Sequence, residues 1–145
     1  DVPDDEYLVP FGKARIVSEG NDCTLVATGR MVSFCENAAQ ALAEDGITCD
    51  IIDPRTTSPL DEDAILDSVE KTGRLVVVDE TPPRCSFAAD IAALAAGEVF
   101  SSLKAPVRQI TGPHSPVPFA KELEGEFVPS PTKIRDAVAE VVNFK

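Results

Sequence analysis

Short runs of apolar residues limit what this chain can fold into. Residues 22–28, 47–52 and 75–78 are each long enough for one strand and too short for a buried helix. Because residues 22–28 are apolar on both faces, they predict a parallel strand that is covered by helices on both sides of the sheet. Two further strands are predicted at residues 14–17 and 107–111.

Segments with helical periodicity separate these strands. Val32, Cys35, Ala39 and Leu42 recur every three or four positions, which predicts one apolar stripe against a core. An alanine-rich segment further on lacks a polar face, so we expect its helix to be deeply buried. The last helix begins at Ser130, an N-cap residue followed by proline. The predicted helices span residues 31–44, 61–71, 86–100 and 130–144.

The order of these elements predicts the fold class. It is α/β, a three-layer α/β/α sandwich with a mainly parallel five-stranded sheet and one antiparallel edge strand. Gly20 and Asn21 are typical of a tight turn, so we expect residues 14–17 and 22–28 to form a hairpin that supplies the antiparallel edge. The 145 residues fit one domain of ordinary size.

An excess of acidic residues excludes some classes of partner. The chain has 25 Asp and Glu against 13 Lys and Arg, a net charge of -12, which disfavours nucleic acid and anionic membrane surfaces. Residues 36–70 hold ten carboxylates and a single cation, Arg55, which we expect to pair with a carboxylate. This acidic quarter is either a solvated face or a docking surface for a basic partner. No apolar segment reaches the roughly 20 residues that span a bilayer.

The cysteines indicate reduced thiols. Cys23, Cys35 and Cys49 lie within the apolar strand and helix patterns, and the four cysteines include no C-x-x-C pair. With a single histidine, His114, the chain has few ligands for zinc. Buried and reduced thiols predict a cytoplasmic location.

Candidate binding residues follow the predicted strands, at the edge where open α/β sheets bind ligands. Arg55, Asp79, Glu80 and His114 are expected there, and we call them the rim residues. Asp79 and Glu80 are either a general base or metal ligand, or a polar strand end that orients the next loop. No motif supports a nucleophilic pair of Cys85 with His114. A G-x-G-x-x-G loop and a P-loop are both absent, so no nucleotide site is predicted.

Two further features concern a loop near the last helix and the start of the chain. Three prolines within residues 113–118 predict an ordered, stiff loop instead of a helix or a ladder strand. The chain begins with Asp1, and its single methionine is Met31. We therefore expect further sequence upstream, with the acidic residues 1–10 serving as a linker.

Four blocks of sequence together resemble a known family. They are VATGRMV at residues 26–32, IDPRTTSPLD at 52–61, KTGRLVVVDE at 71–80 and TGPHSPVPF at 111–119. In this order and spacing they resemble the C-terminal domain of the beta subunit of thiamine-diphosphate-dependent 2-oxo acid dehydrogenases. The second and fourth blocks are most similar to the beta subunit of acetoin dehydrogenase, with the pyruvate and branched-chain 2-oxo acid enzymes close behind. The resemblance therefore does not distinguish between acetoin, pyruvate and a branched-chain 2-oxo acid as the substrate.

The resemblance implies a transketolase C-terminal-like domain over residues 11–145, linked by residues 1–10 to an upstream pyrimidine-binding domain. In this family thiamine diphosphate and magnesium lie between that upstream domain and the alpha subunit, whose G-D-G motif does not occur here. The parent complex is expected to be an oxidoreductase. We expect this chain alone neither to bind the cofactors nor to catalyse a reaction.

Assembly is the role that the resemblance leaves for this domain. It implies contacts with a second beta subunit, with the alpha subunit and with the basic subunit-binding domain of the dihydrolipoyl acyltransferase. The docking surface of relatives includes the C-terminal end, which corresponds here to Asn143 and Phe144, and Lys145 adds a cation beyond them. The alternatives are a related domain of another transketolase-like enzyme, or a free-standing α/β enzyme or small-molecule-binding domain that uses the rim residues.

Overall fold

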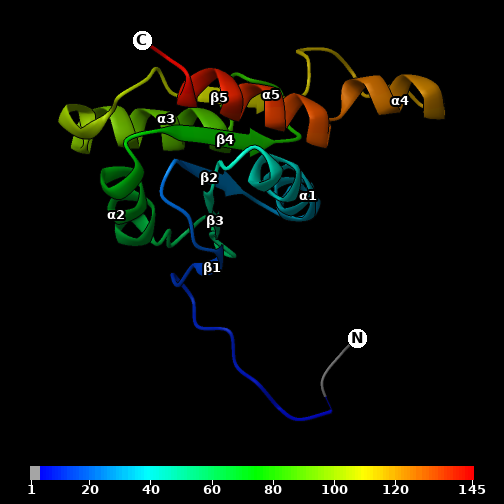
Figure 1. The fold of residues 1–145 in the computed structure, drawn as a ribbon. Helices are drawn as coiled ribbons and strands as arrows, with labels where there is room; N and C mark the ends of the chain where they lie inside the picture. The colour runs from blue at the N-terminus through cyan, green and yellow to red at the C-terminus, as the bar shows by residue number, and fades with distance from the viewer. Residues whose placement is uncertain (1–3) are drawn as a thin grey trace.

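A five-stranded sheet organises the computed structural model, which describes residues 4–145 (Figure 1). The strands are β1 Arg15–Ser18, β2 Cys23–Ala27, β3 Cys49–Asp53, β4 Leu75–Asp79 and β5 Arg108–Thr111. Their order in the sheet is β1-β3-β2-β4-β5, with β1 antiparallel and the other strands parallel. β2 lies at the centre, where all of its residues are buried. The predicted strands and the mainly parallel sheet are thus confirmed.

Helices cover both faces of this sheet. They are α1 Arg30–Glu44, α2 Glu62–Thr72, α3 Phe87–Glu98, α4 Lys121–Phe127 and α5 Pro131–Val142, together with the 3-10 helix η1 Phe100–Ser102. α1 and α5 pack on one face, and α2 and α3 on the other. Because successive strand residues point to opposite faces, Val76 and Val78 join the first core while Leu75 and Val77 join the second. The three-layer α/β/α sandwich is confirmed.

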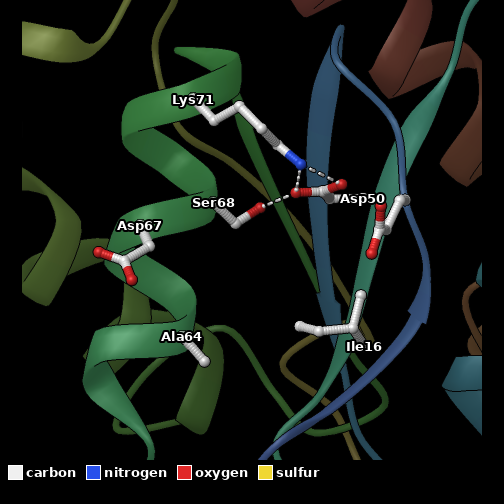
Figure 2. A pocket seen from close by; sticks show the side chains of 7 residues that line it. Ile16, Asp50, Ala64, Asp67, Ser68 and Lys71 are labelled. Atoms are coloured by element: carbon white, nitrogen blue, oxygen red, sulfur yellow. Dashed lines mark hydrogen bonds and ion pairs between the residues drawn. The ribbon is translucent and has the colours of Figure 1, made fainter.

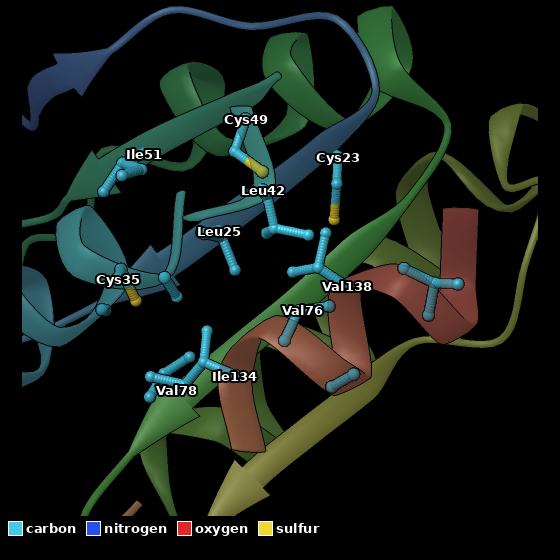
Figure 3. Packing of buried hydrophobic residues seen from close by; sticks show 14 of the residues in the cluster. Cys23, Leu25, Cys35, Leu42, Cys49, Ile51, Val76, Val78, Ile134 and Val138 are labelled. Atoms are coloured by element: carbon cyan, nitrogen blue, oxygen red, sulfur yellow. The ribbon is translucent and has the colours of Figure 1, made fainter. Parts of the chain in front are cut away.

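The core under α1 and α5 contains three of the four cysteines. Figure 3 shows Cys23, Cys35 and Cys49 among branched side chains such as Leu42 and Ile134. All three thiols are free and buried, as the apolar patterns predict. Burial raises the pKa of Cys35 and Cys49 to about 12, so both thiols stay protonated at neutral pH.

The antiparallel edge strand is confirmed, but the hairpin that was expected to form it is wrong. β1 pairs with β3 instead of β2, with Ile16 opposite Ile52. The turn between β1 and β2 passes over the start of β3. The N–H of Gly20 donates to Oδ1 of Asp50 at 2.7 Å, and a Cβ on Gly20 would lie 2.3 Å from the nitrogen of Cys49. The hydrogen bond between Gly20 and Asp50, which are 30 positions apart, therefore sets the path of the chain after β1, and the local turn sequence does not.

Two helices differ from expectation. The alanine-rich α3 is not deeply buried, because Ala88 and Ile91 face the sheet while Ala93 and Ala96 are exposed. α4 has no counterpart among the predicted helices. It begins after Ala120, whose side chain makes no capping hydrogen bond, so no start signal precedes it. Along residues 4–145 no helix is long and apolar enough to cross a membrane.

Candidate functional site

Asp79, at the end of β4, is bonded within the fold. The residue is 3% exposed, and its carboxylate accepts hydrogen bonds from the N–H and the hydroxyl of Thr81 at 3.0 and 2.7 Å. It also accepts one from the N–H of Ala88 at 3.3 Å. These bonds hold the loop after β4 against the first turn of α3. The geometry favours the interpretation of a polar strand end that orients the next loop.

The other rim residues do not converge on Asp79. Glu80 accepts a hydrogen bond from Nε of Arg30 at 2.7 Å, and both side chains are about half exposed. His114 and Cys85 lie exposed on separate loops. No hydrogen bond or ion pair in the described part of the chain joins any two of the rim residues. The structure therefore does not assemble these residues into one site.

Arg55 binds backbone instead of a carboxylate, so the expected ion pair is wrong. Its Nε and Nη2 donate to the carbonyl oxygen of Lys13 at 2.9 and 2.7 Å, and Nη2 also reaches that of Ala14 at 3.3 Å. The antiparallel pairing of β1 with β3 explains this arrangement, because it brings residues 13–14 beside the loop after β3. Arg55 thus fixes the backbone of residues 13–14, which leads into β1.

An ionic cluster around the buried carboxylate of Asp50 joins β3 to α2. Figure 2 shows Lys71 and Ser68 of α2 directed at Asp50 of β3. Nζ of Lys71 lies 2.7 and 2.6 Å from the two carboxylate oxygens, and Oγ of Ser68 donates to Oδ2 at 2.6 Å. The N–H of Gly20 also donates a hydrogen bond to Oδ1 of Asp50, at 2.7 Å. Oγ of Ser68 also lies 2.7 Å from Oγ1 of Thr24, which is the strand partner of Asp50.

This cluster stabilises the fold and leaves no charge free for a ligand. Burial alone raises the pKa of Asp50, but the hydrogen bonds from Lys71, Ser68 and a backbone N–H outweigh it and hold the pKa below its usual range. A hollow of about 340 Å³ beside the cluster is also lined by Glu19 and Asp67. Sequence reasoning missed the cluster, although a carboxylate inside a buried strand requires partners. Nowhere in residues 4–145 do three or more possible metal ligands gather.

An apolar groove lies near the amino-terminal end of β5 and the end of the chain. It has a volume of about 510 Å³, and the two aromatic residues that line it, Phe100 and Phe144, are 73% and 52% exposed. Exposed Ala96 of α3 adds to its wall. Asn143 is placed differently, because its Nδ2 donates to the carbonyl oxygen of Ala139 at 2.8 Å. Of the two predicted interface residues, only Phe144 lines the groove, and sequence reasoning missed Phe100.

Comparison with known proteins assigns the chain to a family. Residues 12–134 match the family described as transketolase, C-terminal domain. The acetoin:2,6-dichlorophenolindophenol oxidoreductase subunit beta of Bacillus subtilis is 51% identical over 98% of this chain and 42% of its own length. The pyruvate dehydrogenase E1 component subunit beta of Rickettsia bellii is 40% identical over 100% of this chain and 45% of its own length. The chain therefore spans less than half of either relative.

A solved structure agrees with this assignment at the level of the fold. A split-gene transketolase, described as an inactive beta4 tetramer, superposes with a TM-score of 0.82 at 23% identity, covering 100% of this chain and 45% of its own. The family match includes all four sequence blocks in full, and most of the matched residues lie in the sandwich just described. From motifs, fold and relatives together, the chain belongs to the transketolase C-terminal domain family.

Proposed function

We propose that this chain is the assembly and docking domain of the beta subunit of a thiamine-diphosphate-dependent dehydrogenase that acts on acetoin or a 2-oxo acid. The 51% identity to the acetoin oxidoreductase beta subunit, over 98% of the chain, is the observation that supports this most. In the proposal, residues 1–10 link the domain at 11–145 to an upstream pyrimidine-binding domain. The complex works in the cytoplasm, where the free thiols stay reduced.

The proposal places the cofactors outside this chain. Thiamine diphosphate, which supplies carbanion-stabilising chemistry when bound, and magnesium are held by the upstream domain and the alpha subunit. The bonding of the rim supports this division. Asp79 is committed to Thr81 and Ala88, and Glu80 to Arg30, so neither carboxylate is free to act on a substrate. The domain alone is not a catalyst in this proposal.

The first test is an activity measurement on the natural polypeptide that contains this chain, purified with its alpha subunit. We expect thiamine-diphosphate-dependent reduction of 2,6-dichlorophenolindophenol with acetoin, pyruvate or a branched-chain 2-oxo acid, and no reduction when either subunit is left out. Comparing kcat/KM for the three substrates identifies the one that the enzyme uses. Failure of all three substrates to reduce the dye with both subunits present would contradict the proposed function.

The apolar groove is the proposed docking surface for the basic subunit-binding domain of the acyltransferase, and contact with a second beta subunit is the other assembly role proposed. Phe100 and Phe144 offer two exposed aromatic anchors beside a single charged lining residue, Lys104. Aromatic anchors dominate the binding energy of many interfaces. The net charge of -12 attracts a basic partner and speeds its association at low salt.

Replacing Phe144 by alanine is expected to weaken binding of the subunit-binding domain about tenfold, because it removes one aromatic anchor from the groove. Affinity of the unmodified protein should also fall as salt is raised. Isothermal titration calorimetry at two salt concentrations measures both effects. Phe119→Ala is the matched control, since this phenylalanine is exposed on a different surface. Equal affinities of the Phe144→Ala variant and the unmodified protein would exclude the groove as the docking surface.

A further inference from the structure

The turn between α2 and β4 is bonded to two separate parts of the domain that flank the apolar groove. It contains Gly73 and Arg74, which end the KTGR segment of the third sequence block. One part of the groove lining is residues 103–107, and another is Phe144 near the end of the chain. Figure 1 shows this turn and the C terminus at the same end of the sheet. The turn is therefore placed to fix how these two parts of the lining lie relative to each other.

Residues 103–107 are attached to the turn through Lys104. Gly73 ends α2 in the left-handed conformation, with φ 74°, and its carbonyl oxygen accepts a hydrogen bond from the N–H of Lys104 at 2.7 Å. Nζ of Lys104 donates to the carbonyl oxygen of Thr72 at 3.3 Å. A Cβ on Gly73 would lie 2.7 Å from Cδ of Lys104, so the lysine side chain crosses directly over the glycine. Backbone and side chain of Lys104 thus both bind the turn.

Arg74 binds the end of α5 through its side chain. Its Nε donates to the carbonyl oxygen of Val141 at 3.0 Å, and its Nη1 donates to that of Asp22, the residue before β2, at 3.3 Å. The last four carbonyl groups of a helix have no partner within the helix, and a cation there also interacts favourably with the helix dipole. The guanidinium therefore ties the last turn of α5, three residues before Phe144, to the start of β2.

We propose that Arg74 is a positioning residue for the apolar groove, and the inference rests on the docking function proposed for that groove. Arg74 lies outside the lining, so it acts on a partner through Phe144. By fixing the carbonyl group of Val141, it sets where the chain leaves α5 and thereby where the Phe144 ring lies before the partner binds. An anchor that is already held in place loses less conformational entropy on binding, which raises the affinity.

The bonding of Arg74 requires a guanidinium and not merely a positive charge. Two of its nitrogens serve carbonyl groups on different elements, and a guanidinium holds its N–H donors in a fixed fork. A lysine at this position would keep the charge but offer a single nitrogen. Arg135, in the first half of α5, differs because it pairs with its neighbour Asp136 on the helix surface. Arg135 therefore provides a control with the same charge on the same helix.

The test measures binding of the subunit-binding domain to the natural polypeptide that contains this chain, by isothermal titration calorimetry. Arg74→Gln is expected to raise the Kd about fivefold, because Phe144 loses its fixed position. Arg74→Lys should raise the Kd about threefold or more, since it keeps the charge and loses the second nitrogen. Arg135→Gln removes the same charge from an exposed surface pair, and its Kd should stay within about twofold of the unmodified value.

A double-mutant cycle distinguishes positioning from a general loss of stability. If Arg74 acts through Phe144, Arg74→Gln should raise the Kd no further in a protein that already carries Phe144→Ala. Combined with Phe100→Ala, whose ring comes from η1, it should keep its full effect. Hydrogen exchange of the unbound polypeptide gives a second readout. The N–H of Asn143, bonded to the carbonyl oxygen of Ala139 at 3.1 Å, should exchange faster in Arg74→Gln, and the N–H groups of β3 should not.

The results that overturn this inference differ from those that overturn the docking function. An unmodified protein that does not bind the subunit-binding domain refutes the docking function of the groove and, with it, the inference. A Kd that Arg74→Gln leaves within about twofold, or that Arg74→Lys restores in full, refutes the inference alone. Additive effects of Arg74→Gln and Phe144→Ala, or unchanged exchange at Asn143, also overturn it, because Arg74 then does not act by holding the end of α5.

Discussion

Replacing Asp50 by alanine is expected to lower the free energy of unfolding by about 3 kcal/mol. The change leaves Ser68 and the N–H of Gly20 without their acceptor in a buried place, and it leaves Lys71 without its counter-ion. The Lys71 side chain is 44% exposed and can return to water, so the loss stays at the lower end of what breaking a buried ion pair costs. Urea denaturation monitored by circular dichroism measures the change.

The same cluster makes stability depend on pH. Because the pKa of Asp50 is lowered in the folded state, its contribution is fully present above the pKa of about 3.9 that an unfolded aspartate has, and it is lost as the pH falls through the folded-state value. The unmodified protein should therefore lose more stability than the Asp50→Ala variant below about pH 4. Parallel pH profiles of the two proteins in that range would contradict the role given to Asp50.

Asp67→Asn is the matched control for the substitution at Asp50. Asp67 lines the same hollow but is exposed, and it makes no hydrogen bond in the described structure (Figure 2). Its substitution should change the unfolding free energy by less than about 0.5 kcal/mol. Similar losses for Asp50→Ala and Asp67→Asn would show that removing any acid near this hollow is destabilising, and that the bonded cluster has no special role.

Gly20→Ala is the second substitution with a large expected effect, about 3 kcal/mol of lost stability. A Cβ on Gly20 would lie 2.3 Å from the backbone nitrogen of Cys49 and 2.5 Å from its carbonyl carbon. Both atoms belong to backbone at the start of β3, so no side chain can rotate to make room. Relieving the overlap would move the turn away from β3 and stretch the 2.7 Å hydrogen bond from Gly20 to Asp50. Thermal unfolding measures the loss.

A glycine-to-alanine change without an overlap serves as the control. Gly97 lies in α3, is exposed, and has nothing within 4 Å of the position of an added Cβ. Alanine there should stabilise the protein by about 0.5–1 kcal/mol, because alanine favours the helix more than glycine does. A Gly20→Ala protein that is as stable as the unmodified one would show that the turn can move without cost.

Much of this fold was predictable because its signals are local. Periodicity within short windows predicted the strands and four of the five α-helices, and Ser130 as an N-cap is confirmed by its bond to the N–H of Lys133 at 3.2 Å. α4 lacked such a signal, because Ala120 at its start does not cap it. Two errors, the hairpin and the ion pair of Arg55, share one origin: both depend on β1 lying beside β3.

The candidate site was less predictable, because exposure and bonding depend on the whole structure. Asp79 and Glu80 were recognisable as polar residues after a strand, yet only the structure shows that Asp79 is bonded inward and Glu80 to Arg30. Phe144 was singled out by the family resemblance, whereas Phe100 and Phe119 resemble any other apolar residue in the sequence. Their exposure becomes visible only once the sheet and helices are placed around them.

By itself, the sequence determined the layered α/β architecture, the reduced and buried thiols and the membership of the transketolase C-terminal domain family. These follow from spacing along the chain and from blocks of residues that lie together in it. Only the tertiary structure decided which strand β1 joins, which carboxylate is buried and which aromatic residues face outward. The reason is physical: Gly20 and Asp50 are 30 positions apart and Thr24 and Ser68 are 44 apart, and such contacts form only when the chain folds as a whole.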